Sequence, residues 1–309
     1  MMRVLITGIA GFLGINLARE YLKKGWEVHG IDDLSVGERS WLPNAVYFIK
    51  QNISKEFSLR GIRPNLVIHL ASRKIPRDGN SQKGLIENTS GLLRMAKFAY
   101  RAKIKFIYLS TSDVYGKNTS WKEDSDLVMG PTDVMRWSYA VSKIWGEQLL
   151  YSMPNNFKFN IIRLFGTYGP YHALSWTAGP QSVFISQAIK KEPITIHGDG
   201  MQKRAFQYVD DAIDGIIRVA ESDYKREVFN IGNPNESITI DDLSRLIWKL
   251  VNPTRMRPAI NIPHSSYKYE EIPERVPDIS KARELLGFEP KISLEEGLRR
   301  TIKWQKTVM

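Results

Sequence analysis

The sequence predicts an α/β protein with a doubly wound parallel sheet, and two observations support that prediction. Short runs rich in β-branched residues alternate with helical patterns through the first half of the 309 residues. A glycine-rich turn, TGIAGFLG, joins the first run to the first helix. Because strand–helix–strand crossovers are right-handed, this alternation places helices on both faces of one parallel sheet.

The expected elements of this first part follow one another along the chain. The expected strands are residues 3–8, 27–32, 45–50, 66–71 and 105–110. The expected helices are residues 11–24 and 81–103. The β-branched runs are nearly continuous in their apolar character, which is typical of parallel strands covered on both faces.

The character of the chain changes after the segment FNIIRLFGTYGP, residues 159–170, where prolines and aromatics become more frequent and the elements shorter. We therefore expect a smaller C-terminal α/β domain that binds substrate. The first domain is expected at 1–165, with returning segments near 205–232, and the second mainly at 166–309. Helices are expected to pack at 280–286 and 293–305.

Composition and charge narrow the classes of function. The net charge is +11, but the basic residues are scattered singly or in pairs, so a solvated surface that attracts a small anion is favoured over a nucleic-acid site. No apolar run is long enough to cross a bilayer, the first residues enter a strand directly, and there is no cysteine. We expect a cytoplasmic protein that makes no membrane contact. The histidines show no metal-ligand spacing, so no metal site is expected.

The glycine-rich turn predicts a dinucleotide site. Gly8 permits a tight turn, Gly11 lets the backbone approach a pyrophosphate at the helix N-terminus, and Gly14 lets the helix pack on the sheet. Asp32 ends the second strand, where a carboxylate binds a ribose diol and repels a 2′-phosphate. No arginine directly follows Asp32, so NAD is favoured over NADP. The alternative is that the glycines serve only the turn.

Tyr139 and Lys143 are one helical turn apart and point to the same side of a helix. A lysine ammonium, together with an oxidised nicotinamide, favours the phenolate form of a tyrosine, which then takes the proton of a substrate hydroxyl. Thr111, at the carboxyl end of a parallel strand, is placed to hydrogen-bond the same oxygen. The alternative is a pair of surface residues spaced this way by chance.

These motifs together resemble a known family. TGIAGFLG, IDDLS, HLAS, LSTSDVYG, SYAVSK, RLFGTYGP, GDGMQKRAFQYVDDAIDGI and ERVPDISKARELLGF occur in the order seen in the extended short-chain dehydrogenases that modify nucleotide-diphosphate sugars. UDP-glucose 4-epimerase, dTDP-glucose 4,6-dehydratase and UDP-glucuronate decarboxylase belong to it. The resemblance covers nearly the whole chain and implies a Rossmann-type fold with NAD as cofactor and a nucleotide-diphosphate sugar as substrate.

The resemblance also implies roles for individual residues. The implied cofactor-binding residues are Gly8, Gly11, Phe12, Leu13, Gly14, Asp32, Asp33, Asn52, Ile53, Leu70, Ala71, Lys74, Asn88, Tyr139 and Lys143. The implied substrate-binding residues are Thr111, Gln181, Val183, Arg204, Arg275 and Asp278. Arg204, Arg275 and Asp278 match positions that bind the nucleotide half of the substrate, where arginine suits a diphosphate by charge and forked geometry.

One position departs from the family pattern. Gly166 stands where the family usually has an asparagine that helps to hold the phosphate region of the substrate. Its side chain is lost, so we expect more room there and one donor fewer. The following segment, Tyr171–Gln181, is an aromatic loop that either closes over the substrate or simply covers the core.

The reaction depends on Asp113. Family members first oxidise the sugar at C4 to a 4-keto intermediate and then diverge. A dTDP-glucose 4,6-dehydratase has aspartate and glutamate after its threonine, whereas this chain has Ser112 and Asp113. We therefore favour an NAD-dependent 4-epimerase, with UDP-hexose as the expected substrate. The alternatives are a 4,6-dehydratase or a UDP-glucuronate decarboxylase that uses Asp113, and a non-catalytic dinucleotide-binding scaffold.

A homodimer is also expected. Val141, Ile144 and Trp145 lie roughly opposite the site-facing side of the catalytic helix, where something must cover them. The helix at 81–103 offers a second apolar surface through Leu92, Met95, Ala96 and Ala99. The resemblance implies that both helices pair with their copies across a two-fold axis. The alternative is that another part of the same chain covers Trp145.

Overall fold

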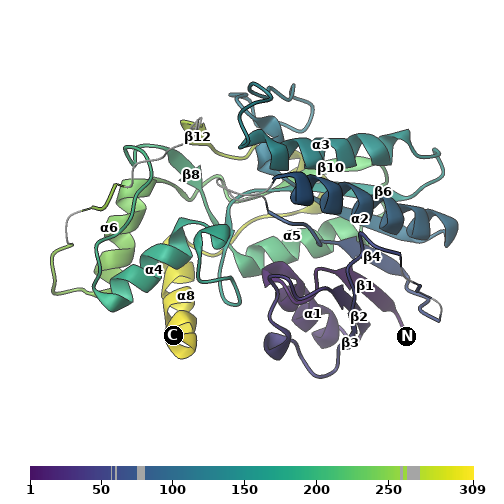
Figure 1. The fold of residues 1–309 in the computed structure, drawn as a ribbon, viewed down its shortest axis with the longest axis horizontal. Helices are drawn as coiled ribbons and strands as arrows, with labels where there is room; N and C mark the ends of the chain where they lie inside the picture. The colour runs from purple at the N-terminus through teal and green to yellow at the C-terminus, as the bar shows by residue number, and fades with distance from the viewer. Residues whose placement is uncertain (57, 60, 75–80, 258–259, 263–271) are drawn as a thin grey trace.

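The structure is a computed structural model that describes residues 1–56, 58–59, 61–74, 81–257, 260–262 and 272–309. Within these residues, seven parallel strands form the main sheet in the order β10-β6-β5-β4-β1-β2-β3 (Figure 1). The strands are β1 (Arg3–Thr7), β2 (Glu27–Asp32), β3 (Tyr47–Lys50), β4 (Leu66–His69), β5 (Lys105–Thr111), β6 (Phe159–Leu164) and β10 (Glu227–Ile231). The predicted doubly wound sheet is confirmed.

Helices cover both faces of this sheet. One face carries α1 (Phe12–Lys23) and α5 (Val209–Glu221), and the other carries α2 (Ser81–Arg101) and α3 (Trp137–Ser152) (Figure 1). The central strands are apolar along their length because both faces are covered: every residue of β4 is buried, as are the middle five of β5.

Three further helices, α4 (Pro180–Lys190), α6 (Ile240–Val251) and α8 (Leu294–Val308), gather at one end of the molecule, whereas α7 (Ser280–Leu286) lies at the main sheet. Helices α4, α6 and α8 pack on one another, and α7 packs beside β10 (Figure 1). Short strands form a second sheet in the order β11 (Ser237–Thr239), β8 (Lys203–Ala205) and β12 (Glu274–Arg275), and a pair of β7 (Thr167–Tyr168) with β9 (Gln207–Tyr208).

The chain crosses between these two parts more than once. After building α4, β8 and α5, it returns to the main sheet as β10, which pairs with β6 in parallel. The segment that returns thus lies close to the predicted range of 205–232. The boundaries at 1–165 and 166–309 stay a prediction, because the small strands and helices belong to both stretches of sequence.

Two further properties follow from the described residues. No helix among them is both long and apolar enough to span a membrane. The face of α2 offered by Leu92, Met95, Ala96 and Ala99 is fully buried inside the chain, against the main sheet. The expectation that these four residues form an intermolecular surface was therefore wrong, because a long amphipathic helix first covers its own sheet.

Candidate active site

The glycine-rich turn after β1 forms a close-packed loop. Gly8 has φ +74°, and a Cβ there would lie 2.8 Å from the Ala71 amide nitrogen. A Cβ on Gly14 would lie 2.3 Å from the Gly8 carbonyl oxygen. A Cβ on Gly11 would meet only that same oxygen, at 3.3 Å, so the space beside Gly11 is otherwise open. Phe12 and Leu13 then begin α1, whose free N–H groups suit a pyrophosphate.

Asp32 lies where the cofactor ribose is expected. Its carboxylate accepts hydrogen bonds from the amides of Ala10, at 3.0 Å, and Leu34, at 2.8 Å. Burial raises the pKa of Asp32, and the two amides act against that rise. The carboxylate is thus held by backbone at the rim of the glycine loop, a position that fits a ribose diol.

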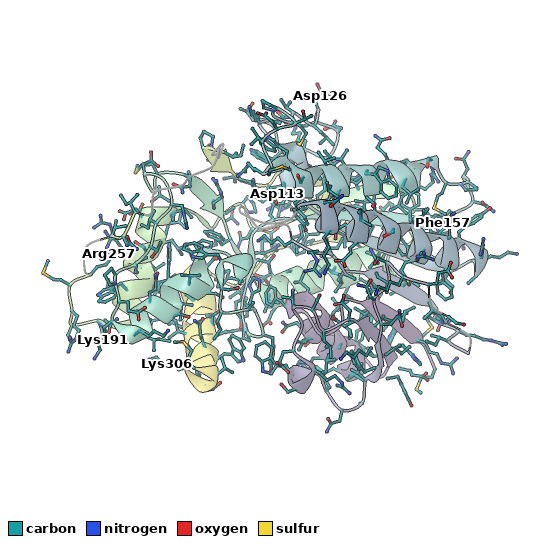
Figure 2. All side chains as sticks on the ribbon, viewed as in Figure 1. Asp113, Asp126, Phe157, Lys191, Arg257 and Lys306 are labelled. Atoms are coloured by element: carbon teal, nitrogen blue, oxygen red, sulfur yellow. The ribbon has the colours of Figure 1, made fainter. Side chains whose placement is uncertain are left out.

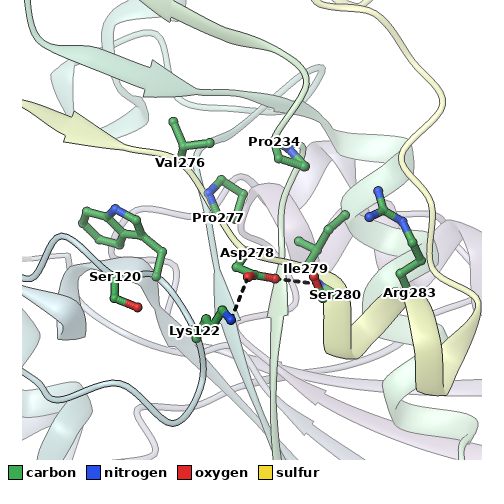
Figure 3. A pocket seen from close by; sticks show the side chains of 10 residues that line it. Ser120, Lys122, Pro234, Val276, Pro277, Asp278, Ile279, Ser280 and Arg283 are labelled. Carbon is green, nitrogen blue, oxygen red and sulfur yellow. Dashed lines mark hydrogen bonds and ion pairs between the residues drawn. The ribbon is translucent and has the colours of Figure 1, made fainter.

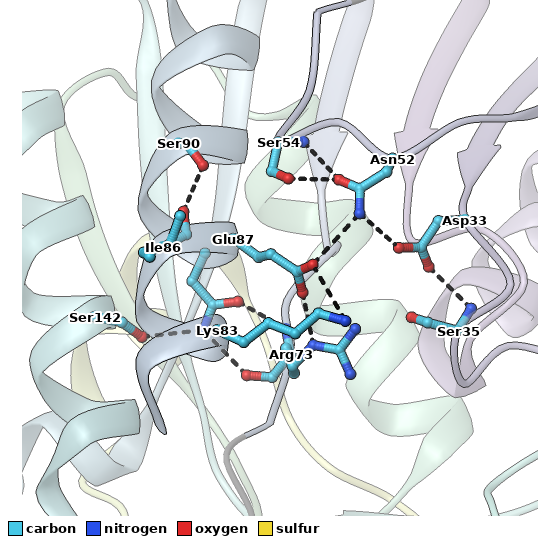
Figure 4. A network of polar contacts seen from close by, with 11 residues as sticks. Asp33, Ser35, Asn52, Ser54, Arg73, Lys83, Ile86, Glu87, Ser90 and Ser142 are labelled. Atoms are coloured by element: carbon cyan, nitrogen blue, oxygen red, sulfur yellow. Dashed lines mark hydrogen bonds and ion pairs between the residues drawn. The ribbon is translucent and has the colours of Figure 1, made fainter. Parts of the chain in front are cut away.

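A polar network extends from Asp33, next to Asp32, toward α2 (Figure 4). The Asn52 side chain donates to the Asp33 carboxylate at 3.0 Å, and its oxygen accepts from Ser54. Glu87 pairs with Arg73 at 2.6 Å. Asp33 and Asn52, both predicted to bind the cofactor, are thus brought together. Ile53 lies close to Gly91 of α2, and its side chain would contact a Cβ built on that glycine.

The segment after β4 lies against the glycine loop. The Ala71 amide donates to the Thr7 hydroxyl at 3.3 Å, and Leu70 packs on the core. Asn88, predicted on the cofactor side, is buried and donates to the Ser142 hydroxyl at 3.1 Å. Asn88 therefore ties α2 to the catalytic helix. Lys74 lies close enough to Asp113 for its charge to lower the pKa of that carboxyl.

The structure brings the predicted catalytic residues into one region. The Lys143 side chain is only 2% exposed, and its Nζ donates to the Leu109 carbonyl at 2.8 Å. That Nζ lies 5.7 Å from the centre of the Tyr139 ring. Thr111 ends β5 beside Asp113, whose amide donates to the Thr111 hydroxyl at 3.2 Å.

Burial dominates the ionisation of the catalytic pair. It lowers the pKa of Lys143 to about 7, with the charge of Glu147 acting in the opposite direction. It raises the pKa of Tyr139, and the charge of Asp113 adds to that rise. The ammonium alone therefore does not produce a phenolate in this structure. The further positive charge expected from an oxidised nicotinamide is needed as well.

Asp113, labelled in Figure 2, pairs with a cation that comes from far along the chain. Arg275 of β12 reaches its carboxylate at 2.6 Å. Burial alone would raise the pKa of Asp113, but Arg275, Arg136 and Lys74 outweigh burial and lower it to about 2. Arg275 was predicted at the nucleotide half of the substrate. The structure places its guanidinium against Asp113, whose other carboxylate oxygen accepts a hydrogen bond from the Thr111 hydroxyl at 3.3 Å, and its substrate role stays a prediction.

The other predicted substrate residues are spread around this centre. Arg204 of β8 lies next to Arg275 of β12 in the register of these two parallel strands. Gln181 is buried at the start of α4, and its Nε2 has no hydrogen-bond partner among the described residues. Val183 lies half-buried two residues further on. The N-cap Gly179 gives this helix no side-chain cap, so its N-terminus remains open to an anionic ligand.

Asp278 lies elsewhere, in the lining of a separate pocket (Figure 3). Its carboxylate accepts from the Ser280 amide at 2.8 Å and lies 4.0 Å from Lys122 Nζ. Asp278, Ser280 and Lys122 line a pocket of about 340 Å³, together with Trp121 and Arg283. In this structure Asp278 therefore helps to begin α7, and the substrate role implied for it stays a prediction.

Gly166 is needed for packing. A Cβ there would lie 2.8 Å from the Ala205 carbonyl oxygen and 3.1 Å from the Phe206 ring. The expectation that this glycine leaves room was wrong, because the chain from β8 to β9 fills the space. In the aromatic loop, His172 stacks on Phe12 at 4.0 Å, so the start of that loop lies against the glycine-rich turn.

Metal ligands are not grouped in the described part of the chain: no cluster of three or more His, Cys, Asp or Glu side chains could hold an ion there. His69 is buried in β4, and its ring Nδ1 lies 2.9 Å from the Thr7 hydroxyl. Burial lowers the pKa of His69 to about 3. It is a packed, neutral residue.

Comparison with known proteins gives the same family from sequence and from structure. The chain is 33% identical to UDP-N-acetyl-alpha-D-glucosaminuronate decarboxylase of Bacillus cytotoxicus, covering 99% of this chain and 98% of that protein. It is 32% identical to UDP-glucuronic acid decarboxylase 2 of Arabidopsis thaliana, over 98% and 68%. The crystal structure of UDP-glucuronic acid 4-epimerase from Bacillus cereus, in complex with UDP-glucuronic acid and NAD, superimposes with a TM-score of 0.82 over 100% of both chains, at 27% identity.

The family model for the NAD dependent epimerase/dehydratase family matches residues 4–232. This range contains the glycine loop, Asp32, Thr111, Tyr139 and Lys143, which the structure places at the same edge of the sheet. The chain has the Rossmann-type sheet of the extended short-chain dehydrogenases. Its glycine loop fits NAD, the dinucleotide in the name of the family. The chain therefore belongs to the NAD dependent epimerase/dehydratase family, whose cofactor is NAD.

Proposed function

We propose that this protein is an NAD-dependent decarboxylase of a nucleotide-diphosphate uronic acid, such as UDP-glucuronic acid. The observation that supports this most strongly is the ion pair of Asp113 with Arg275, 2.6 Å apart beside Thr111. Lys74 and Arg136 add positive charge at the same carboxylate. A centre that is net positive next to the reacting carbons suits a sugar that carries its own carboxylate.

The ionisation of Asp113 argues against the dehydratase alternative. A dehydratase needs a carboxyl group that removes the C5 proton. A carboxylate with a pKa of about 2, held by an arginine, is a poor base near neutral pH. Decarboxylation requires no such base, because a β-keto acid releases carbon dioxide when the electrons of the broken bond pass to the neighbouring ketone.

The residues can then be given roles. NAD, when bound, accepts the hydride from C4 and later returns it. Tyr139 takes the proton of the C4 hydroxyl, and Thr111 hydrogen-bonds that oxygen. Arg275 orients the C6 carboxylate until the bond to C5 breaks and carbon dioxide leaves, with Asp113 holding the guanidinium in place, and C5 then takes a proton from water. Tyr139 finally gives its proton back to the C4 oxygen.

The similar proteins support this substrate class. Two similar proteins are decarboxylases of UDP-linked uronic acids. A similar solved structure is a 4-epimerase in complex with UDP-glucuronic acid, and it also acts on a uronic acid. The 4-epimerase that we favoured from the sequence is therefore the second candidate, now with a carboxylated sugar as substrate. It would use the same Tyr139 and Lys143.

One experiment separates the candidates. The NAD-loaded protein is incubated in deuterated water with UDP-glucuronic acid, and in parallel with UDP-glucose, and the products are identified by NMR. A UDP-pentose with deuterium at C5 supports decarboxylation. Inversion at C4 with the carboxylate retained supports the epimerase. Deuterium at C5 with loss of water from UDP-glucose would restore the dehydratase.

The control is Tyr139→Phe, which removes only the hydroxyl that moves the proton. We expect turnover to fall by at least about 100-fold while NAD binding stays close to wild type. Undiminished turnover in that variant would contradict the assignment of Tyr139. Turnover of none of these sugars by the wild type would favour the non-catalytic scaffold.

A further inference from the structure

A buried ion pair lies two helical turns along α3 from the catalytic tyrosine. Arg163 of β6 binds Glu147 of α3 with two hydrogen bonds, Nε to Oε1 at 3.2 Å and Nη2 to Oε2 at 2.8 Å. Both side chains are only 6% exposed. The Ser110 hydroxyl donates to Glu147 Oε1 at 2.5 Å. A pair buried this deeply costs desolvation energy, so stability alone is a weak reason for it.

The position of Glu147 links it to the catalytic residues. Tyr139, Lys143 and Glu147 are spaced by four residues, so their side chains follow one another along the same side of α3. Lys143 is in the middle. Ser110, which binds Glu147, directly precedes Thr111 at the end of β5. One carboxylate is therefore connected to the strand end and to the helix that together hold the catalytic groups.

Arg163 extends this connection to the loop that follows Thr111. Its Nη1 donates to the Glu123 carbonyl at 3.0 Å, and its guanidinium lies 4.9 Å from the centre of the Tyr115 ring. Tyr115 ends the short 3₁₀ helix η2 (Ser112–Tyr115), which contains Asp113. The pair thus touches each segment that supplies a catalytic side chain without itself reaching the reacting atoms.

The titratable groups around Lys143 come from three elements. On α3 they are Tyr139 and Glu147. On β5 it is Tyr108, whose ring centre lies 5.0 Å from Lys143 Nζ, and on β4 it is His69. Burial raises the pKa of Tyr108 and lowers that of His69, so both are neutral near pH 7. Of these neighbours, Glu147 is the one that carries a negative charge.

We propose that the Glu147–Arg163 pair is a positioning device for the catalytic pair, in which Glu147 supplies the counter-charge that keeps Lys143 an ammonium and Arg163 keeps that carboxylate fixed. Without it, the groups that the described part of the chain places next to the ammonium are the Leu109 carbonyl and the rings of Tyr108 and Tyr139. Tyr139 depends on that ammonium to become a phenolate, so Glu147 acts on Tyr139 through Lys143.

The test reads the ionisation of Tyr139 directly and needs no substrate. Absorbance at the tyrosinate band is titrated in the NAD-loaded protein, with Tyr139→Phe in the same background as the baseline. In Glu147→Gln we expect the midpoint of Tyr139 ionisation to move to higher pH by about one unit. Lys143 lies between the two groups, so its lost charge outweighs the more distant loss of the Glu147 charge.

A double variant separates positioning from a merely structural role. Glu147→Gln leaves Arg163 buried without its charged partner, so we expect a lower unfolding temperature. Glu147→Leu with Arg163→Met removes both charges, and such replacements are often neutral or stabilising. If the pair positions the catalytic residues, the double variant should regain the unfolding temperature of wild type, but the pH midpoint of Tyr139 ionisation should stay raised. A double variant that titrates like wild type would overturn the proposal, as would an unshifted Glu147→Gln.

Asp241→Asn is the matched control, because it breaks another partly buried pair, with Arg257 at 2.7 Å, in the distant part of the molecule. Its Tyr139 midpoint should equal that of wild type. A second measurement rests on the proposed function: with UDP-glucuronic acid as the probe, the acidic limb of kcat should move to higher pH in Glu147→Gln while KM changes little. Failure of wild type to turn over this probe would reject the proposed function only, since the titration still decides the role of Glu147.

Discussion

At the scale of the residue, the proposed function depends on Arg275. Its guanidinium lies 2.6 Å from Asp113 and only 15% of its side chain is exposed. If it orients a substrate carboxylate, Arg275→Gln should weaken binding of UDP-glucuronic acid by about 10- to 100-fold, the usual cost of losing a charged hydrogen bond. Binding of UDP-glucose, which has no carboxylate, should change much less.

Calorimetry with both ligands measures the difference. Arg283→Gln is the control, since Arg283 pairs with Glu289 at the surface. Equal losses for the two ligands would show that Arg275 binds the diphosphate or nucleotide, as the sequence had led us to expect, and would remove the main support for a uronic acid.

Residues also differ in how far the sequence can predict them. Tyr139 and Lys143 are found by their spacing on one helix, and Gly8 by its place directly after a strand. The contact between Asp113 and Arg275 has no local signal, because it depends on where β12 pairs with β8. Glu147 was missed for a related reason: a glutamate on a helix is ordinarily a solvated residue, and only its distance from Arg163 of β6 reveals a buried pair.

At the scale of the element, the glycine loop offers a comparison between two glycines. Gly8 and Gly25 have nearly equal positive φ values, +74° and +76°, but a Cβ on Gly25 meets nothing within 4 Å. Gly25→Ala should therefore cost only the backbone strain, about 1–2 kcal/mol. Gly8→Ala adds a collision with the backbone of Ala71, so it should cost more and also weaken NAD binding.

Thermal unfolding with and without added NAD checks this pair of variants. The stabilisation by NAD should persist in Gly25→Ala and be lost or much reduced in Gly8→Ala. Equal effects of the two substitutions would mean that the close approach of Gly8 to Ala71 does not matter for the cofactor.

Helix α3 carries the remaining prediction of a homodimer. Val141 is 46% and Trp145 is 39% exposed, whereas Ile144 packs on a cluster within the chain. We propose that the exposed stripe of α3 meets a second copy. Light scattering should give about twice the chain mass, and Trp145→Glu should shift it toward monomer. Trp176→Glu, with a tryptophan 41% exposed elsewhere, should not. A monomeric wild type would refute the interface.

At the scale of the whole molecule, the Asp113–Arg275 pair joins the main sheet region to the small sheet of β12. The pKa of Asp113 is lowered from 3.8 to about 2, so its contribution to stability is present above pH 4 and is lost as the pH falls through 2. The difference in unfolding free energy between wild type and Asp113→Asn should therefore be constant from pH 7 to pH 5 and shrink toward pH 2. Chemical denaturation at each pH measures it.

The architecture was predictable to the extent that it depends on local patterns. The alternation of strands and helices predicted the parallel sheet, and the helix expected at 280–286 matches α7. The packing of the second part was not predictable in the same way. Its strands have only two or three residues, too short for a periodic signal, and their pairing joins segments such as β8 and β12 that are distant in the chain.

The return of the chain to β10 has a consequence for how the protein is made. Strand β6 ends at Leu164, but the strand that covers its free edge ends at Ile231. At ribosomal speeds of about 5–20 residues per second, the nascent chain therefore exposes that edge for several seconds before its partner has been synthesised. An uncovered parallel edge invites pairing with other chains. A release of the chain near residue 165 should accordingly yield an aggregating fragment, and the newborn protein should depend on chaperones during this interval.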